Sequence, residues 1–254
     1  MKGSKFITLA LGALLAVTLI VGCGPKNEMS ALERIKEAGV ITVGTSPDYP
    51  PFESIDDKGN IIGFDIDLAR AVAAELGVEV EFVNMGFDSI ITAVKSGQIN
   101  VGVSSFSINE DRKASIDFSV PYLISSQVVV VQKDSPLKTV EDLAGKQVAV
   151  AIGTTCAEAA KNIKGIDLKI VDDNNLTVMM LANRSADAVV LDVAIAKEYQ
   201  KKRGFDIMEK PLQMEETACV IMKGNETLKQ EIDKAIETVK ANGTFDTLKA
   251  KWQI

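Results

Sequence analysis

Histidine is absent from this 254-residue chain, and cysteine occurs only three times. Without histidine the chain cannot hold a Ser-His-Asp triad, a Cys-His dyad or a metal site with histidine ligands. Besides Cys23, the chain contains Cys156 and Cys219, and these two cysteines are too few for a disulfide scaffold. These two would either pair outside the cytoplasm or stay free, and we expect two free, partly buried thiols.

Positive charge is also scarce, because 28 Lys and Arg residues stand against 35 Asp and Glu residues, for a net charge of −7. The chain has no run of basic residues, which argues against nucleic acid as a partner and against a polybasic membrane patch. We therefore expect no nucleic-acid partner. We also expect no cofactor, no metal and a monomeric state.

The first residues have the anatomy of an export signal. Lys2 and Lys5 precede an apolar run of 16 residues (6–21), which is shorter than the roughly 20 residues of a membrane-spanning helix. The run ends at Ile20-Val21-Gly22-Cys23, which resembles the lipobox of bacterial lipoproteins. We expect residues 1–22 to be a lipoprotein signal peptide, and residues 23–29 to be a lipidated (palmitate-bearing) Cys23 and a linker. The alternative is an uncleaved signal-anchor with an incidental cysteine.

Predicted strands alternate with predicted helices beyond residue 29, which is typical of an α/β protein with parallel sheets. Ser30 and Glu33 form the pattern of a capping box, opening a helix that ends at Gly39. The two prolines at 50 and 51 place residues 48–53 in a loop or at a sheet edge. The other predicted strands are 40–45, 78–83, 99–103, 127–131, 147–152, 168–171, 188–191 and 217–222. The other predicted helices are 65–76, 88–96, a short one from 139, 155–163, 176–183, 193–202 and 225–242.

Arg112 and Asp192 are the most informative pair of residues in the chain. A free α-amino acid carries a carboxylate and an ammonium on neighbouring atoms, so a site for it needs a fixed cation and a fixed anion. Guanidinium suits the carboxylate because its planar fork donates two parallel hydrogen bonds. In open α/β sheets, ligands bind at the carboxyl ends of strands, and two such ends from two lobes would face one cleft.

Around this pair, the chain resembles the extracytoplasmic solute-binding proteins of the polar amino acid ABC transporter family (family 3, type II periplasmic-binding-protein fold). The likeness covers residues 30–254, and its motifs are specific in their order and spacing. They are Pro50-Pro51-Phe52-Glu53, Gly63-Phe64-Asp65-Ile66-Asp67-Leu68, residues 108–112 with 116–119, residues 142–146, residues 186–189, and Asn242-Gly243-Thr244. The resemblance implies a two-lobe α/β clamshell whose sheets are flanked by helices and joined by two crossover strands. Lobe 1 would hold residues 30–125 and 217–254, and lobe 2 residues 126–216.

The resemblance also implies a function and a set of site residues. The protein would bind a free L-amino acid between its lobes and deliver it to the membrane permease of an ABC importer, held by its lipid at the outer face of the bacterial cell membrane. Arg112 would bind the ligand carboxylate and Asp192 its ammonium. The other implied contacts are the hydroxyl and backbone of Ser107, the carbonyl of Ser105, the helix start at Thr154 and Thr155, and the aromatic walls Tyr49 and Phe87.

Ser46 departs from part of this family. It is the ninth expected ligand contact, and it stands where members that bind lysine or arginine usually carry an acid, so we expect a neutral polar ligand. Asp48, Glu215 and Glu216 are the acids that would replace the missing carboxylate.

Each implied role has an ordinary structural alternative. Arg112 would be a surface arginine paired with Asp117 or Glu110, and Asp192 would only cap a helix. Tyr49 and Phe87 would be core or turn aromatics, and Ser107 a turn former.

Two other functions stay open beside the expected, non-enzymatic receptor. One is an enzyme similar to cyclohexadienyl dehydratase, for which Glu158 and Glu216 are the only candidate acids. The other is a free-standing amino acid sensor.

Overall fold

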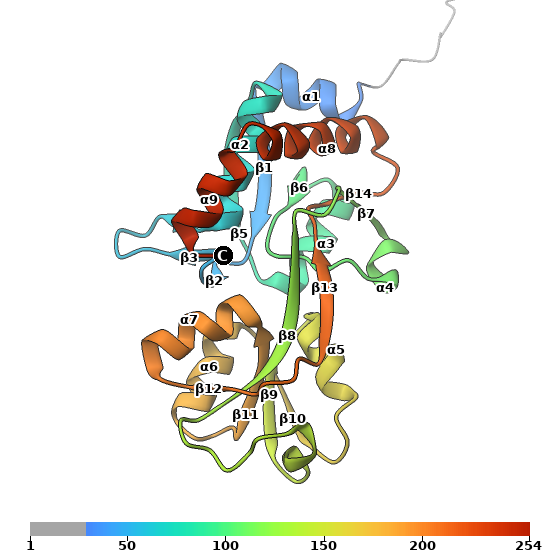
Figure 1. The fold of residues 1–254 in the computed structure, drawn as a ribbon. Coiled ribbons are helices and arrows are strands. Elements are labelled where there is room, and N and C mark those ends of the chain that lie inside the picture. The colour runs from blue at the N-terminus through green and yellow to red at the C-terminus, as the bar shows by residue number, and fades with distance from the viewer. Residues whose placement is uncertain (1–28) are drawn as a thin grey trace, which may run out of the picture.

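Two α/β lobes make up the protein, joined by two strands that run from one lobe into the other (Figure 1). The computed structural model describes residues 29–254. The predicted signal peptide and Cys23 lie outside these residues. Within 29–254, no helix has the length and apolarity needed to cross a membrane. The predicted two-lobe α/β clamshell is confirmed.

Lobe 1, the upper lobe in Figure 1, is built on a five-stranded sheet. Its strand order is β5 (Glu79–Asn84), β1 (Val40–Thr45), β6 (Val101–Gly102), β14 (Val220–Met222) and β7 (Ile116–Phe118). Its helices are α1 (Ala31–Ala38), α2 (Phe64–Leu76), α3 (Phe87–Ser96), α4 (Glu110–Lys113), α8 (Glu226–Ala241) and α9 (Thr244–Trp252). A small antiparallel sheet of β2 (Asp48–Tyr49), β3 (Glu53–Ile55) and β4 (Ile61–Ile62) follows β1.

Lobe 2 holds a six-stranded sheet. Its order is β10 (Asp167–Val171), β9 (Gln147–Ala151), β11 (Ala188–Asp192), β8 (Leu123–Val131) and β12 (Asp206–Ile207), and β13 (Gln213–Thr217) also pairs with β8. The lobe has a 3₁₀ turn at Val140–Leu143 and the helices α5 (Thr155–Lys161), α6 (Asn174–Ala182) and α7 (Val193–Arg203). The strands β8 and β13 are the two connections between the lobes (Figure 1). The predicted lobe boundaries fall inside them and stay predictions.

The expected parallel pairing is found for β1 with β5 and β6, and for β9 with β10 and β11, but each large sheet also contains antiparallel strands. β8 runs antiparallel to β11, β12 and β13, and β14 runs antiparallel to β6 and β7. These strands enter a sheet from the other lobe, so no crossover helix forces them into the parallel direction. The strand β13 escaped prediction because its sequence, QMEET, lacks an apolar alternation. The helix α9 escaped because Gly243, expected to end the preceding helix, also begins the next one.

The capping box at the start of α1 is confirmed. Ser30 Oγ accepts from the backbone N–H of Glu33 at 3.2 Å, and the Glu33 carboxylate accepts from the Ser30 N–H at 2.7 Å. Gly39 ends the helix in the left-handed conformation, with φ 69°.

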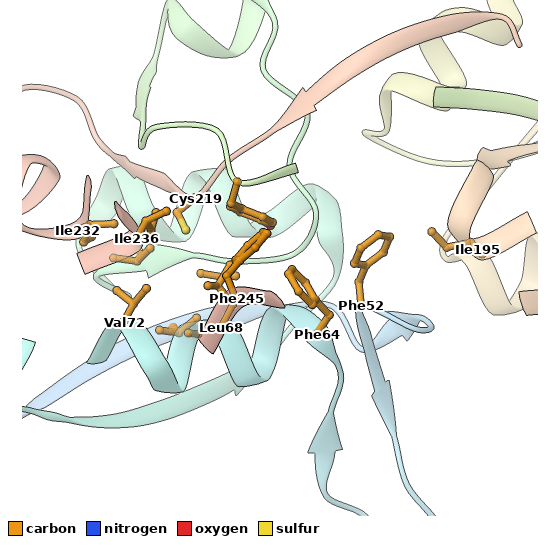
Figure 2. Close-up of a cluster of buried hydrophobic side chains, with 14 of the residues drawn as sticks. Phe52, Phe64, Leu68, Val72, Ile195, Cys219, Ile232, Ile236 and Phe245 are labelled. Carbon is orange, nitrogen blue, oxygen red and sulfur yellow. The ribbon is translucent and has the colours of Figure 1, made fainter. Parts of the chain in front are cut away.

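Apolar side chains form a continuous cluster that reaches from lobe 1 to lobe 2 (Figure 2). In lobe 1, Phe64 packs edge-on against Phe52 and Phe245, with ring centroids 6.2 and 5.5 Å away. Ile195 of α7 belongs to the same cluster and lies beyond Phe52, on the lobe 2 side in Figure 2. Burial of this apolar surface therefore helps to hold the two lobes together.

Candidate ligand-binding site between the lobes

A cavity lies between the two lobes. Most of the residues that line it lie at or just after the carboxyl ends of the parallel strands β1, β6, β9, β10 and β11. This is the usual position of the ligand in open α/β sheets. The lining residues are Asp48, Tyr49, Glu53, Phe87, Ser104, Ser105, Ser107, Arg112, Thr154, Thr155, Cys156, Asn174 and Asp192.

Arg112 is the buried cation of this cavity, with 8% of the residue exposed. It lies on the single-turn helix α4, which Asn109 caps by accepting from the Arg112 backbone N–H at 2.8 Å. Its guanidinium donates to the carbonyl of Ser107 at 2.8 Å and to the carbonyl of Gly153, in lobe 2, at 3.0 Å. Burial lowers the pKa of Arg112, but a guanidinium stays charged in proteins.

The surface-arginine alternative does not hold for Arg112. Glu110 pairs with Lys113 at 2.9 Å, and the carboxylate of Asp117 accepts from the backbone N–H of Gly224 at 2.7 Å. Arg112 lies instead over two aromatic rings, with its guanidinium carbon 5.5 Å from the centre of Phe87 and 5.3 Å from that of Phe106. The two rings stack on each other at 4.5 Å, so they fix the plane against which the guanidinium lies.

Asp192 is the buried anion that lobe 2 contributes, with 5% of the residue exposed. It occupies the position before α7, but its side chain makes no capping hydrogen bond. Its backbone N–H donates to the phenol oxygen of Tyr49, in lobe 1, at 3.1 Å. Burial, and then the negative charge of Glu215, raise the pKa of Asp192 to about 7. Tyr49 and the positive charge of Arg112 act in the opposite direction but only offset part of this increase. A cation bound beside Asp192 would favour its charged form.

Ser107 and Thr155 bring hydroxyl groups from the two lobes into contact. Thr155 Oγ1 lies 3.2 Å from Ser107 Oγ, and both hydroxyls donate to the carboxylate of Glu215, at 2.8 and 2.5 Å. Glu215 belongs to β13 and also accepts from the amide of Gln127 on β8 at 3.1 Å. The two crossover strands are therefore linked at the edge of the cavity by one carboxylate.

Thr154 and Ser105 contribute mainly through their backbone positions. Thr154 caps α5, because its Oγ1 accepts from the backbone N–H of Ala157 at 3.1 Å and donates to the carbonyl of Ala151 at 2.8 Å. Ser105 has φ 49°, a left-handed conformation that is uncommon for a residue with a side chain.

Asp48 connects the two lobes at the other end of the cavity. Its Oδ2 accepts from the backbone N–H of Asn174 at 2.6 Å and from the Asn174 side-chain amide at 3.0 Å. Asn174 is the first residue of α6, so the carboxylate of lobe 1 lies at a helix N-terminus of lobe 2. Ser46 does not line the cavity; its hydroxyl donates to Asp48 Oδ1 at 2.9 Å.

Cys156 is a buried thiol on the cavity wall. Burial raises the pKa of this thiol well above its ordinary value. Cys219 lies buried in the core of lobe 1, and both cysteines are free, as expected.

The structure brings together eight of the nine predicted ligand contacts, all except Ser46. Sequence reasoning gave no role to Glu53, Ser104 or Asn174. The sequence did contain a signal for Asn174, because Asp173 and Asn174 come just after the end of a predicted strand, where ligands bind. It was missed because the following helix was expected to begin at Leu176. Asp48 and Glu215 were considered only as replacements for a missing acid.

The two acids considered for an enzyme lie outside the cavity. Glu158 and Glu216 are exposed, and Glu158 pairs with Lys161 at 2.7 Å. Within the described residues, no cluster of three potential metal ligands is present.

Comparisons with known proteins agree with this fold. The family model for bacterial extracellular solute-binding proteins, family 3, matches residues 41–253. The L-cystine-binding protein TcyJ of Escherichia coli K12 is 32% identical over 250 residues, covering 96% of this chain and 94% of the relative. The arginine-binding extracellular protein ArtP of Bacillus subtilis is 32% identical over 255 residues, covering 98% and 97%. The crystal structure of the ancestral amino acid-binding protein AncCDT-1, a precursor of cyclohexadienyl dehydratase, is 36% identical, covers 88% of this chain and 99% of that chain, and has a TM-score of 0.84.

Proposed function

The chain belongs to the bacterial extracellular solute-binding proteins, family 3, and from that premise we propose that it binds one free L-amino acid between its lobes and delivers it to an ABC importer. The single observation that carries this proposal is the pair Arg112 and Asp192. They are buried, of opposite charge, supplied by different lobes, and line the same cavity. A zwitterion is the ligand chemistry that pairs with both at once.

In this proposal each lobe binds one end of the ligand. Arg112 uses two of its five N–H donors on backbone carbonyls, which leaves donors for the α-carboxylate. The hydroxyls of Ser107 and Thr155 lie at the same side of the cavity. Asp192 would take the α-ammonium, together with the carbonyl of Ser105. Closure of the lobes then excludes water and strengthens both ion pairs.

The side chain of the ligand would lie between Tyr49 and Phe87. The sequence expectation of a neutral polar ligand rests on the uncharged Ser46, which acts on the cavity only through its hydrogen bond to Asp48. The carboxylate of Asp48, to which Ser46 donates, favours a side chain that carries hydrogen-bond donors. Both are met by a donor-bearing side chain such as the amide of glutamine. The related proteins are named for cystine and arginine, so these two belong in every test of specificity.

We extend the proposal to the location of the protein. A lipid on Cys23 would anchor it at the outer face of the cell membrane, where a permease would receive the ligand. Mass spectrometry of the membrane-extracted protein tests this: acylated Cys23 at the N-terminus supports anchoring, and an intact N-terminus at Met1 contradicts it.

A thermal-shift screen of residues 24–254 against each common amino acid and cystine tests the binding function. The protein is unfolded and refolded first, to remove co-purified ligand. A ligand at a hundred times its dissociation constant adds about 2.7 kcal/mol of stability, which gives a shift of a few degrees. A shift with one or a few amino acids supports the proposal, and no shift across the panel contradicts it.

A further inference from the structure

Two carboxyl groups face each other in the interior of lobe 1. Glu53, on β3, is 1% exposed, and Asp65, in the first turn of α2, is fully buried. Asp65 lies beside β3, because its backbone N–H donates at 3.0 Å to the carbonyl of Phe52, the chain neighbour of Glu53. Glu53 Oε2 and Asp65 Oδ1 are buried and have no hydrogen-bond partner among the described residues. Two charged carboxylates buried side by side repel each other, and one proton held between them would remove that repulsion and give both oxygens a partner.

No cation neutralises the pair. Within residues 29–254, neither carboxyl group forms an ion pair. The titratable groups that face it from the neighbouring elements are Asp48, Tyr122 and Cys219, and none of them is cationic. Burial and the charge of Asp65 raise the pKa of Glu53 well above its usual range, and burial raises that of Asp65 to about 6.

The hydrogen bonds around the pair identify the protonated member. Asp65 Oδ2 accepts from the backbone N–H of Ser105 at 2.6 Å, from the Ser105 hydroxyl at 3.3 Å and from the phenol of Tyr122 at 2.9 Å. Asp65 also lies at the positive end of the α2 dipole. Among the described residues, Glu53 accepts a single bond, from Ser104 Oγ at 3.0 Å. These surroundings suit the ionised form at Asp65 and the protonated form at Glu53.

These bonds hold one wall of the ligand cavity. Ser104 and Ser105 both line it, and Ser105 adopts its left-handed conformation while its N–H is bound to Asp65. Ser104 Oγ also accepts from the backbone N–H of Ser46 at 3.1 Å. Each serine of this wall is thus hydrogen-bonded to one carboxyl group of the pair, Ser104 to Glu53 and Ser105 to Asp65.

We propose that Glu53 and Asp65 share a single proton, and that this proton keeps the Ser104–Ser105 wall in place for ligand binding. Both are positioning residues, because they act on the ligand through the two serines. Loss of the proton at alkaline pH leaves two carboxylates in contact, so the pair separates and the wall loses its support. The binding part rests on the proposed function, whereas the shared proton does not.

The pH dependence of Glu53→Gln, measured against the wild-type protein, tests the proposal. A glutamine amide donates to Asp65 as the protonated acid does, but it does not titrate. The affinity of Glu53→Gln for the ligand should therefore change little between pH 7 and alkaline pH. At alkaline pH, wild-type affinity should fall faster, by up to about tenfold more per pH unit once the proton is lost. The control is Glu75→Gln, at an exposed position on α2, the helix that carries Asp65. Its affinity should depend on pH as that of wild type does.

Ligand-free protein gives a second readout that does not depend on ligand binding. Because the folded pKa of Glu53 is raised, its stabilising effect is complete below the unfolded pKa and is lost as pH rises through the folded value. The melting temperature of wild type should therefore fall with pH more steeply than that of Glu53→Gln. If no amino acid binds at any pH but the two melting profiles differ in this way, the proposed function fails and the shared proton stands.

Infrared spectroscopy of the wild-type protein covers the case in which Glu53→Gln does not fold. A protonated carboxyl band present at pH 7 and lost at alkaline pH supports the proposal. Absence of that band, or identical pH profiles for wild type and Glu53→Gln, overturns it.

Discussion

Tyr49 and Asp192, which are 143 residues apart in the chain, meet across the cleft: the phenol oxygen of one accepts from the backbone N–H of the other at 3.1 Å. Tyr49 belongs to the small sheet of lobe 1, and Asp192 ends the strand β11 of lobe 2. The anion proposed to bind the ligand ammonium is therefore positioned by a residue from the opposite lobe. The proposed site is complete only when the lobes are together, so we expect closure and ligand binding to be coupled.

Removal of Arg112 should abolish measurable binding. Arg112→Ala leaves the ligand carboxylate buried without a cation, at a cost of about 3–5 kcal/mol, or two to four decades in affinity. The affinity of Arg112→Lys for the ligand should lie between those of wild type and Arg112→Ala, because lysine keeps the positive charge but lacks the planar fork of N–H donors. Calorimetry measures both variants. Arg70→Ala, which removes an exposed arginine paired with Asp67, is the control and should bind like wild type. Wild-type affinity in Arg112→Ala would contradict the assignment.

Asp192→Asn should lose binding and yet stabilise the ligand-free protein at pH 8. The pKa of Asp192 is raised to about 7 by burial and by Glu215, so the folded state keeps a proton that the unfolded state releases from about pH 4 upward. The free energy of unfolding of wild type therefore falls between about pH 4 and pH 7. Asparagine removes this dependence, and we expect a gain of about 1–3 kcal/mol at pH 8.

Urea unfolding of wild type and Asp192→Asn at pH 5 and pH 8 measures this difference. Glu216→Gln, at an exposed position outside the cavity, is the control and should follow wild type at both values. If Asp192→Asn is less stable than wild type at pH 8, the prediction is wrong. The charge of Asp192 would then be neutralised by other groups in the ligand-free protein.

Asp48 should stabilise the closed arrangement. Asp48→Asn weakens two bonds to Asn174 and removes the charge at the start of α6. Hydrogen bonds to charged groups contribute about 1.5–3 kcal/mol, so affinity should fall by about one to two decades. Asn174→Ala keeps the backbone N–H bond and should lose less. The effect should lie in the ligand dissociation rate, as stopped-flow fluorescence can measure. Equal dissociation rates in Asp48→Asn and wild type would exclude this role.

The sequence predicted the fold class, most elements and most of the cavity, because strand alternation, capping patterns and family motifs are local signals. It did not predict β13, whose polar residues cross between lobes and are only partly buried. Glu53 and Asp65 were both quoted in motifs, yet they had no predicted role. Proton sharing depends on two side chains being buried together, and spacing alone does not reveal that. Asn174 was missed because a two-residue shift in a helix start moved it off the predicted site.

Cys156 should report the opening of the lobes. Both thiols are buried and their pKa values are raised, mainly by burial, so labelling by a thiol reagent should be slow in residues 24–254. Ligand should slow the labelling of Cys156, on the cavity wall, much more than that of Cys219, in the core of lobe 1. Mass spectrometry of Cys219→Ala and Cys156→Ala measures each thiol separately. Labelling of Cys156 at the same rate with and without ligand would place it outside the ligand-gated space.

Calorimetry of the best ligand from the screen, beside its α-amide, tests the central claim most directly. The amide keeps the side chain and the ammonium but has no carboxylate for Arg112. If Arg112 and Asp192 bind a zwitterion, the amino acid should bind and the amide should lose about two to four decades in affinity. Equal binding of the amide would contradict the account, because the carboxylate would then make no contact that matters.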